Sequence, residues 1–423
     1  MAIITVSANS NYSAIKGSLA DGDTIRIDTN AVRLTIDEQP LLINITVDSP
    51  GVSGRVTVSG AWDLSTWSMV AGTVALIDGT LPSGAVLGNA TGGSVNGAHG
   101  INFNSGTVTT ATASNVNACG VLTNNSDGLI VNVFGGTGAS SQGVGTNNGV
   151  ITNSTGGSGS NAFGVTNNNG TVVNATGGPA GSANGVQTNN GTVTNATGGI
   201  ATSSHGVGIN NGTVTNATGG AASSASGVSN NNGSVENAYV GSFFTAHGVI
   251  TNNGFVTNAF GGLVASSVCV STNAGTVTNA IGGSAIGAVS VGTNNGTVIN
   301  ATGGSAGNAS GVNLNNCSVT NATGGSSTGA SGVNTNLGNV LRASNSLGNG
   351  VNFTLGAVKF VDGPNYSSRI VSSSTSRPVT TVYTIGPLNP ASVIDPGVTV
   401  IELTEGSGGG IMIPRGFRGG YNG

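Results

Sequence analysis

The stretch Gly185–His205, GVQTNNGTVTNATGGIATSSH, decides the fold, because its pattern recurs every 21 residues. We number the positions of this unit from 1 (Gly185) to 21 (His205). Position 2 is valine in ten consecutive copies: Val144, Val165, Val186, Val207, Val228, Val249, Val270, Val291, Val312 and Val333. A fixed period of about 20 residues is typical of a solenoid, in which each repeat forms one coil stacked on its neighbours.

Two further columns of the repeat are apolar and small. Position 9 is Val or Ile, as at Val193, and position 12 is Ala or Ser, as at Ala196. β-Branched residues suit strands, and the segments are too short and too rich in Gly and Asn for helices. The sequence therefore predicts an all-β fold, a parallel β-helix or β-solenoid of 21-residue coils, each with two or three short strands.

Asparagine marks one corner of each coil and paired glycines mark another. Asn is able to adopt the left-handed turn conformation, and stacked Asn side chains form amide ladders. Glycine pairs such as Gly198-Gly199 are expected to supply positive φ angles. Position 5, the predicted structural ladder, is Asn in all ten copies: Asn147, Asn168, Asn189, Asn210, Asn231, Asn252, Asn273, Asn294, Asn315 and Asn336.

Three regions are predicted along the chain. Residues 1–78 contain longer, more charged strands and form an N-terminal β cap. Residues 79–358 form the solenoid, whose early units we expect to open at Gly79, Gly100 and Gly120. Residues 359–423 form a small C-terminal β element with a Gly-rich tail, and predicted strands at 379–383 and 398–403.

Composition argues against several classes of protein. Charged residues make up 6% of the chain, with a net charge of −4, and the repeats lack the basic face that binds nucleic acid. No segment approaches the ~20 apolar residues of a membrane-spanning helix, so membrane insertion is not expected. The first residues lack the pattern of a classical signal peptide, which indicates either assembly in the cytoplasm or export by a route that the sequence does not show. The three cysteines, Cys119, Cys269 and Cys317, are predicted to be buried thiols.

Catalytic and metal-binding patterns are weak. Glu236 is the one charged residue between Asp127 and Arg342, and glycoside hydrolysis needs two acids. Other acid pairs, Asp21 with Asp23 and Asp37 with Glu38, are explained as solvated strand ends. His205 and His247 share position 21 two coils apart, about 9.6 Å at the usual strand spacing, too far to share a metal. We read the histidines as surface residues and expect no enzyme, cofactor or metal.

Two surface features stand out. Threonines flank an inward valine in Thr192-Val193-Thr194 and Thr213-Val214-Thr215, as on flat ice-binding solenoid faces, although Glu236 and Phe255 interrupt that pattern. Apolar residues also cluster within a short stretch. They form a candidate contact for a partner or receptor, or else a locally wider interior: Tyr239, Phe243, Phe244, Phe255, Phe260 and Ile281.

The opening Ala20–Ile27, ADGDTIRI, looks like the first coil of many parallel β-helices. Together with the long Asn/Gly/Thr/Ser array, the chain resembles the β-solenoid fibre and decoration proteins of tailed bacteriophages. This resemblance implies a non-enzymatic protein of the virion surface (a head fibre, capsid decoration or tail fibre), assembled in the host cytoplasm. It also implies a trimer that contacts other virion proteins and host surface glycans. Alternatives are an extracellular bacterial adhesin or surface-filament subunit, and an ice-binding solenoid.

Overall fold

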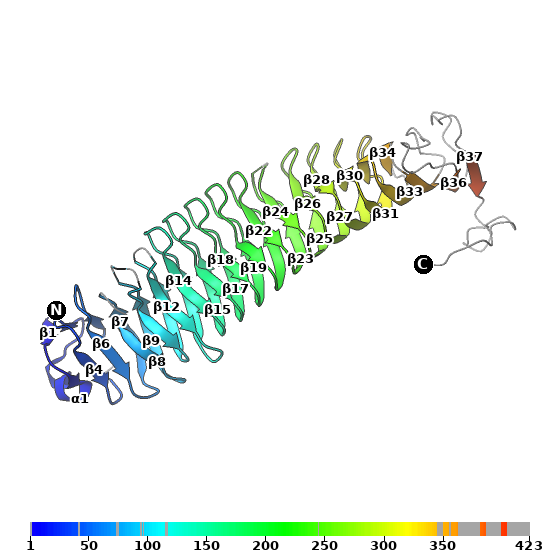
Figure 1. The fold of residues 1–423 in the computed structure, drawn as a ribbon. Coiled ribbons are helices and arrows are strands. Elements are labelled where there is room, and N and C mark those ends of the chain that lie inside the picture. The colour runs from blue at the N-terminus through cyan, green and yellow to red at the C-terminus, as the bar shows by residue number, and fades with distance from the viewer. Residues whose placement is uncertain are drawn as a thin grey trace. The chain divides into compact units, whose positions relative to one another are not determined.

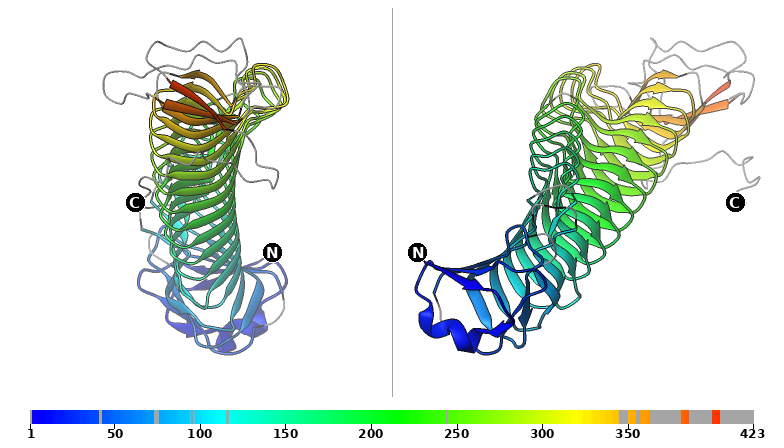
Figure 2. Two further views of the ribbon diagram at one scale, coloured as in Figure 1. Left: turned by 90° about the vertical axis from the view of Figure 1, so that its right-hand side faces the viewer. Right: turned by 60° about the vertical axis from the view of Figure 1, so that its left-hand side comes forward.

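The computed structural model describes residues 2–40, 43–72, 76–93, 95, 97–114, 117–243, 245–344, 350–354, 357–362, 381–385 and 399–403. The chain forms two compact units. The first comprises Met1–Glu236 with Gly241–Ile250, and the second comprises Asn237–Val240 with Thr251–Gly423. Within each unit the strands of successive coils lie one above another (Figures 1 and 2), which confirms the predicted β-solenoid.

Each coil contributes one strand to each of two parallel sheets. In the first unit, one sheet contains β1 (Ile3–Val6), β3 (Thr24–Ile27), β5 (Ile45–Asp48), β7 (Asp63–Val70), β9 (Val86–Thr91), β11 (Thr107–Thr112), β13 (Leu129–Phe134), β15 (Val150–Thr155), β17 (Thr171–Thr176), β19 (Thr192–Thr197) and β21 (Thr213–Thr218). The other contains β2 (Ser10–Asn11), β4 (Arg33–Ile36), β6 (Arg55–Val58), β8 (Ile77–Leu81), β10 (Ile101–Asn104), β12 (Cys119–Asn124), β14 (Gln142–Asn147), β16 (Val165–Asn168), β18 (Val186–Asn189), β20 (Val207–Asn210) and β22 (Ser226–Asn231).

The second unit continues this alternation. Its odd-numbered strands are β25 (Phe255–Phe260), β27 (Thr276–Ile281), β29 (Thr297–Thr302), β31 (Ser318–Thr323), β33 (Asn339–Ser344), β35 (Ala357–Asp362) and β37 (Thr399–Leu403). Its even-numbered strands are β26 (Val268–Asn273), β28 (Val289–Asn294), β30 (Val312–Asn315), β32 (Val333–Asn336), β34 (Val351–Thr354) and β36 (Thr381–Ile385). β23 (Ser234–Tyr239) and β24 (His247–Asn252) contain residues of both units.

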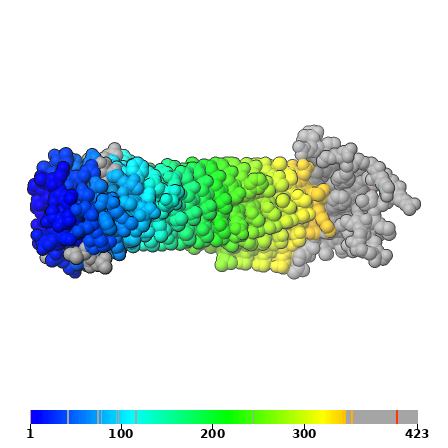
Figure 3. All heavy atoms as spheres, turned by 90° about the horizontal axis from the view of Figure 1, so that it is seen from below, coloured from blue at the N-terminus to red at the C-terminus, as the bar shows by residue number. Residues whose placement is uncertain are grey.

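The 21-residue period sets the register of the sheets. β19 pairs in parallel with β17 and β21, so that Val193 lies opposite Val172 and Val214. In the other sheet Val186 lies opposite Val165 and Val207. On the face that Figure 3 presents, the atoms of neighbouring coils are in direct contact. Identical side chains therefore stack directly on one another.

The interior of the repeated coils is narrow and built from small side chains. The valines of positions 2 and 9 and the alanines of position 12 are buried, and position 20 adds a further column of buried Ala or Ser. A repeated coil therefore buries two valines, the residues of positions 12 and 20, and the position 5 asparagine, as with Val186, Val193, Ala196, Ser204 and Asn189. This arrangement confirms that both strands turn their β-branched residues inward.

The position 5 asparagines form the predicted ladder inside the protein. In the first unit, Asn189 Nδ2 donates to Asn210 Oδ1 at 2.7 Å, while Asn168 Nδ2 donates to Asn189 Oδ1 at the same distance. The second unit repeats the bond, for example from Asn273 to Asn294 at 2.8 Å. Each amide also donates to backbone carbonyls at the turn that follows, as from Asn189 to Gly191 at 3.2 Å. The ladder thus satisfies buried polar groups that would otherwise be costly.

The left-handed corner lies elsewhere than the sequence suggested. Neither the glycine pairs nor the ladder asparagines have positive φ; position 19 does, in Ser140, Asn161, Ser182, Ser203, Ser224, Ser266, Gly287, Asn308 and Gly329. The predicted role of the glycine pairs was therefore wrong. At Gly199 a Cβ atom would overlap the carbonyl oxygen of Gly178 and the hydroxyl of Ser204. The pairs are glycine because two backbones approach too closely for any side chain.

The first 78 residues form coils in the same two sheets. β1, β3, β5 and β7 pair in parallel in sequence order, and β7 pairs with β9. The short helix α1 (Tyr12–Ile15) and 3-10 turn η1 (Lys16–Ser18) follow β2. The buried Tyr12 ring packs edge-on against Trp67, with 5.5 Å between ring centroids. This pair fills the interior of the early coils with aromatic carbon.

One expected coil start was wrong. Ile77 lies opposite Ile101, and Leu76 therefore occupies the place that Gly100 has in the next coil. The pairing of β8 with β10 shifts register after Ile101, so that Thr80 lies opposite Phe103. Gly79 is consequently inside β8 and does not open a unit.

Near the C-terminus, parallel pairing continues from β35 to β36 and from β36 to β37. β36 and β37 lie within two residues of the strands predicted at 379–383 and 398–403. The Gly-rich tail lies outside the described residues. In the described residues no helix is both long and apolar enough to cross a membrane.

Candidate functional site

Three apolar side chains line up on the surface of the second unit, and we call them the apolar strip: Tyr239, Phe260 and Ile281. Each is the last residue of its strand, at position 13 of the repeat. The rings of Tyr239 and Phe260 are stacked, with centroids 5.1 Å apart and an interplanar angle of 10°. Phe260 lies opposite Ile281 in the sheet. Tyr239 and Ile281 are 38% and 39% exposed, so the strip is a surface feature and not a wider interior.

Of the remaining predicted contact residues, Phe255 does not extend this strip. Phe255 is 62% exposed but starts β25, about 16 Å along the strand from Phe260 at the usual rise per residue. Phe243 is 36% exposed and belongs to the first unit. Phe244 lies outside the described residues. Phe255 is therefore not part of the strip.

Two exposed residues that the sequence reading missed follow the strip along the chain. Leu263 and Ile286 are 85% and 67% exposed, in the loops after β25 and β27. These loops are hydrogen-bonded to each other, since the Ser266 amide donates to the Ile286 carbonyl at 2.9 Å. Most coils carry Ser or Ala at position 16, that of Leu263, and Ser, Ala, Gly or Thr at position 18, that of Ile286. The departure from the repeat was the available signal.

A second candidate site lies on the first unit and was not anticipated. A groove of about 280 Å³, here called the histidine groove, crosses successive coils beside β18 and β20. Its lining includes Phe163, Asn184, Gln187, His205, Gly208 and Ile209. Phe163, Asn184 and His205 all occupy position 21, which varies among Phe, Asn, His, Ser and Val from coil to coil. Gly208, inside β20, leaves the groove open where the two neighbouring coils have the side chains of Gln187 and Ser229.

His205 forms the floor of the groove, which corrects the prediction of a surface histidine. It is only 9% exposed, and burial lowers its pKa to about 4 from 6.5. The Ser226 amide donates to Nδ1 at 3.2 Å, and the Ser226 hydroxyl lies 2.8 Å from the same atom. Because a backbone N–H is only a donor, Nδ1 is unprotonated and the neutral ring carries its proton on Nε2. Among the described residues, Nε2 has no hydrogen-bond partner.

The neighbouring amides are held in place. Asn184 Oδ1 accepts from the His205 amide at 2.9 Å, and Asn184 Nδ2 donates to Gln187 Oε1 at 2.7 Å. Because Gln187 Oε1 accepts the bond from Asn184, the donor group of Gln187 is its Nε2. Like His205 Nε2, Gln187 Nε2 has no partner among the described residues. Ser226 is fully buried, so its hydroxyl is not presented to a substrate.

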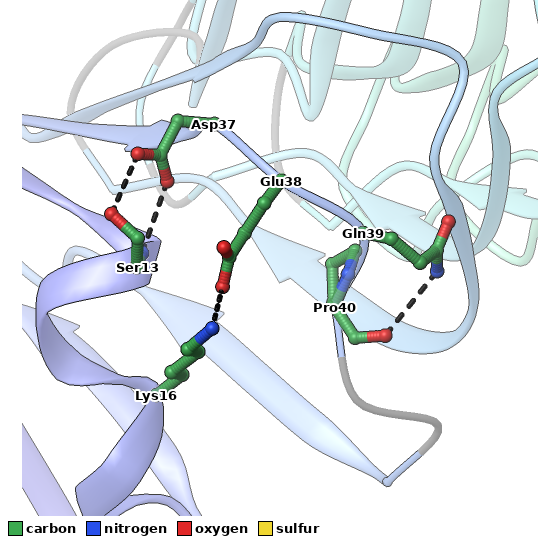
Figure 4. Close-up of polar contacts among 6 residues, drawn as sticks. All are labelled: Ser13, Lys16, Asp37, Glu38, Gln39 and Pro40. Carbon is green, nitrogen blue, oxygen red and sulfur yellow. Dashed lines mark hydrogen bonds and ion pairs between the residues drawn. The ribbon is translucent and has the colours of Figure 1, made fainter.

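The acid pairs of the early coils, Asp21 with Asp23 and Asp37 with Glu38, bind neighbouring parts of the chain. Asp37 accepts from the Ser13 amide at 3.0 Å and from its hydroxyl at 2.7 Å, while Glu38 pairs with Lys16 (Figure 4). These bonds hold α1 and η1 against the end of β4. Asp23 accepts from the Ala20 amide at 2.9 Å and from the Ala2 amide at 2.5 Å, which lowers its pKa.

Asp21 accepts two bonds from Asn44, both at 2.8 Å. Each of the four carboxylates thus has a structural partner. In the part of the chain that the structure describes, no group of three or more His, Cys, Asp or Glu residues is placed to hold a metal ion.

The cysteine prediction was right for two residues and wrong for one. Cys119 and Cys269 are buried, and burial raises the pKa of Cys119 to about 12. Cys269 Sγ donates to the Ala238 carbonyl at 3.0 Å. Cys317 is exposed, because it lies in the turn between β30 and β31.

The threonine pairs point outward as predicted. Val193 and Val214 are buried, whereas the threonines on either side of each are at least partly exposed. Glu236 and Phe255 are exposed at equivalent positions, at 10 and 8, in later coils. The flat threonine surface therefore extends over few coils.

The chain matches no protein-family model, and comparisons with curated proteins and with solved structures gave no significant match.

Proposed function

We propose that this protein is a non-enzymatic structural and adhesive shaft of a virus particle, as a head fibre, capsid decoration or tail fibre. The observation that carries the proposal is the uniformity of the repeated coils: buried amide ladders link coil to coil within each unit, and several large departures from the repeat, such as Leu263 and Ile286, are exposed. Such a construction favours a rigid support that presents surface sites. The virion assignment itself rests on the resemblance described above.

The apolar strip supports self-association in this proposal. Stacked, exposed aromatic rings are uncommon on a monomer that stays alone in solution, and they are frequent at subunit contacts. We infer a homotrimer in which the strip faces a neighbouring chain, with host attachment left to other surfaces.

The first test is the absolute mass of the purified chain by light scattering after size exclusion. A mass three times the chain mass of 40.6 kDa supports the fibre. A clean monomer at micromolar concentration contradicts the trimeric shaft. Detection of the protein in purified virions would separate the fibre from a bacterial surface protein.

Two other functions have their own tests. A surface-filament subunit or adhesin predicts open-ended polymers, visible by electron microscopy, in place of a closed oligomer. The outward threonines at Thr192, Thr194, Thr213 and Thr215 favour the ice-binding alternative, which predicts a monomer with thermal hysteresis.

A further inference from the structure

The chemistry of the histidine groove points to a particular kind of ligand. None of its described lining residues is charged, so an anionic or cationic ligand would find no counter-charge there. The lining is too polar to favour an aliphatic ligand, because buried amides and hydroxyls would lose hydrogen bonds to water. What remains is a neutral ligand that both donates and accepts hydrogen bonds.

The groove offers matching groups for such a ligand. His205 Nε2 and Gln187 Nε2 are donors without partners among the described residues. Ser226 holds the His205 ring, and Asn184 holds the Gln187 amide. The hydroxyls of Ser182, Ser203 and Ser229 line the same groove and both donate and accept. Phe163 and Ile209 add half-buried apolar surface. A sugar ring presents these same two kinds of surface, hydroxyls at its edge and C–H groups on its faces.

The backbone is also shaped for a ligand. Glycine inside a strand weakens it and often marks a place where a ligand approaches closely. A Cβ atom at Gly208 would lie 2.8 Å from Asn184 Nδ2 and 3.1 Å from Gln187 Oε1, and would displace both amides. The volume of about 280 Å³ is near the lower end of small-molecule sites, which are about 300–1,000 Å³.

We propose that the histidine groove binds a neutral oligosaccharide, with Gln187 and His205 donating to its hydroxyls and Phe163 packing against a ring face. This inference specifies the attachment part of the proposed function and rests on it for its biological setting. The binding chemistry itself depends on neither the oligomeric state nor the presence of a virion.

Substitutions that other coils of this chain already contain offer a test with little risk to folding. Phe163→Ser places at position 21 the residue found at Ser310, and Gln187→Ser places at position 3 the residue found at Ser271. Ser271→Ala, at the same strand position in the second unit, is the control. Circular dichroism should show all three variants folded like the parent.

The full chain would be screened on an array of neutral, sialylated and sulfated oligosaccharides. Isothermal titration with the strongest neutral binder then gives its Kd. We expect each groove variant to weaken binding about tenfold or more, the loss of one well-placed contact, and the control to leave it unchanged.

Binding to charged sugars only, no binding at all, or binding that both groove variants retain would overturn the proposal. The mass measurement is unaffected by these outcomes, so failure of the sugar site and failure of the fibre are distinguished.

Discussion

The early coils, which precede the regular repeat, and the repeated 21-residue coils have interiors made of different side chains. The buried aromatic rings of Tyr12 and Trp67, the buried Met69 and most of the fully buried Ile and Leu side chains precede residue 102: Ile25, Ile27, Leu34, Ile36, Ile45, Leu64, Leu76, Ile77, Leu81, Leu87 and Ile101. The repeated coils bury Val, Ala and Asn instead. The early coils are therefore stabilised by apolar area, whereas the repeated coils depend on hydrogen-bonded asparagines and closely approaching backbones.

The difference has a consequence for tolerance to change. A large side chain in an irregular coil has individual neighbours, so its loss leaves a cavity. A ladder asparagine has identical neighbours above and below, so its loss leaves two partners unsatisfied. Four predictions test this contrast, from the largest expected effect on stability to the smallest.

Trp67→Ala should have the largest effect. Its ring is fully buried against Tyr12, and replacing a buried Trp by Ala costs about 3–5 kcal/mol. Urea denaturation of the first unit, followed by far-UV circular dichroism, measures the loss. Phe134→Ala, at an exposed position of β13, is the control and should cost less than about 1 kcal/mol. Equal losses at the two positions would refute a core of large side chains in the early coils.

Asn189 and Asn190 provide a matched pair in the repeated coils. Both accept from one neighbouring coil and donate to another, but Asn189 is buried and Asn190 is exposed. Asn189→Ala should cost roughly 2–3 kcal/mol, because two neighbouring amides lose a buried partner. Asn190→Ala should cost about 0.5 kcal/mol or less, since water replaces the lost bonds. The same urea titration compares them, and similar losses would mean that burial of the ladder is unimportant.

Acid should weaken the two regions in different pH ranges. His205 takes up a proton near pH 4 when folded and near pH 6.5 when unfolded, so the unfolded state holds more protons between these values. Stability must fall as the pH is lowered through this range, by roughly 2 kcal/mol at pH 5. In the early coils the pKa values of Asp23 and Asp37 lie below 3.8, and their contribution is lost only as the pH falls further.

The variant His205→Asn, which repeats the residue of Asn184, checks this assignment. Urea midpoints at pH 7 and pH 5 should differ less in the variant than in the parent. Part of the dependence should persist, because burial also lowers the pKa of His99. An unchanged difference between the two pH values would show that His205 does not carry the effect.

The repeat predicted the fold because the period fixes the register. Because Val186 and Val193 recur every 21 residues, successive coils pair in parallel and stack their valines in the interior. The asparagines of position 5 recur with the same period, so they stack in the same way and form the buried ladder. The left-handed corner did not follow. It lies at position 19, in a loop of small polar residues. Ser, Asn and Gly all adopt a positive φ there, so no single residue type marks the corner.

The histidine groove could not be predicted from one coil. His205 is buried because Asn184 and Ser226 flank it in the coils on either side, and Gly208 opens the groove from the adjacent strand. Asn184, Gly208 and Ser226 lie 3 to 21 positions from His205 and differ in type, so no motif connects them. The signal lies in comparing columns of the repeat: positions 3 and 21 vary from coil to coil while positions 2 and 5 do not.

The apolar strip should matter least for folding and most for assembly. Phe260→Thr and Ile281→Thr place on the surface the residue that Thr197 and Thr302 already provide at position 13. Exposed side chains contribute little to the free energy of unfolding, so the double variant should stay within about 0.5 kcal/mol of the parent per site. Its mass by light scattering should nevertheless fall toward that of one chain. The matched variant Phe255→Thr, on the same strand but far from the strip, should leave the oligomer intact. If both variants keep the parent's mass, the strip is not the subunit contact, and the exposed Leu263 and Ile286 become the residues to replace next.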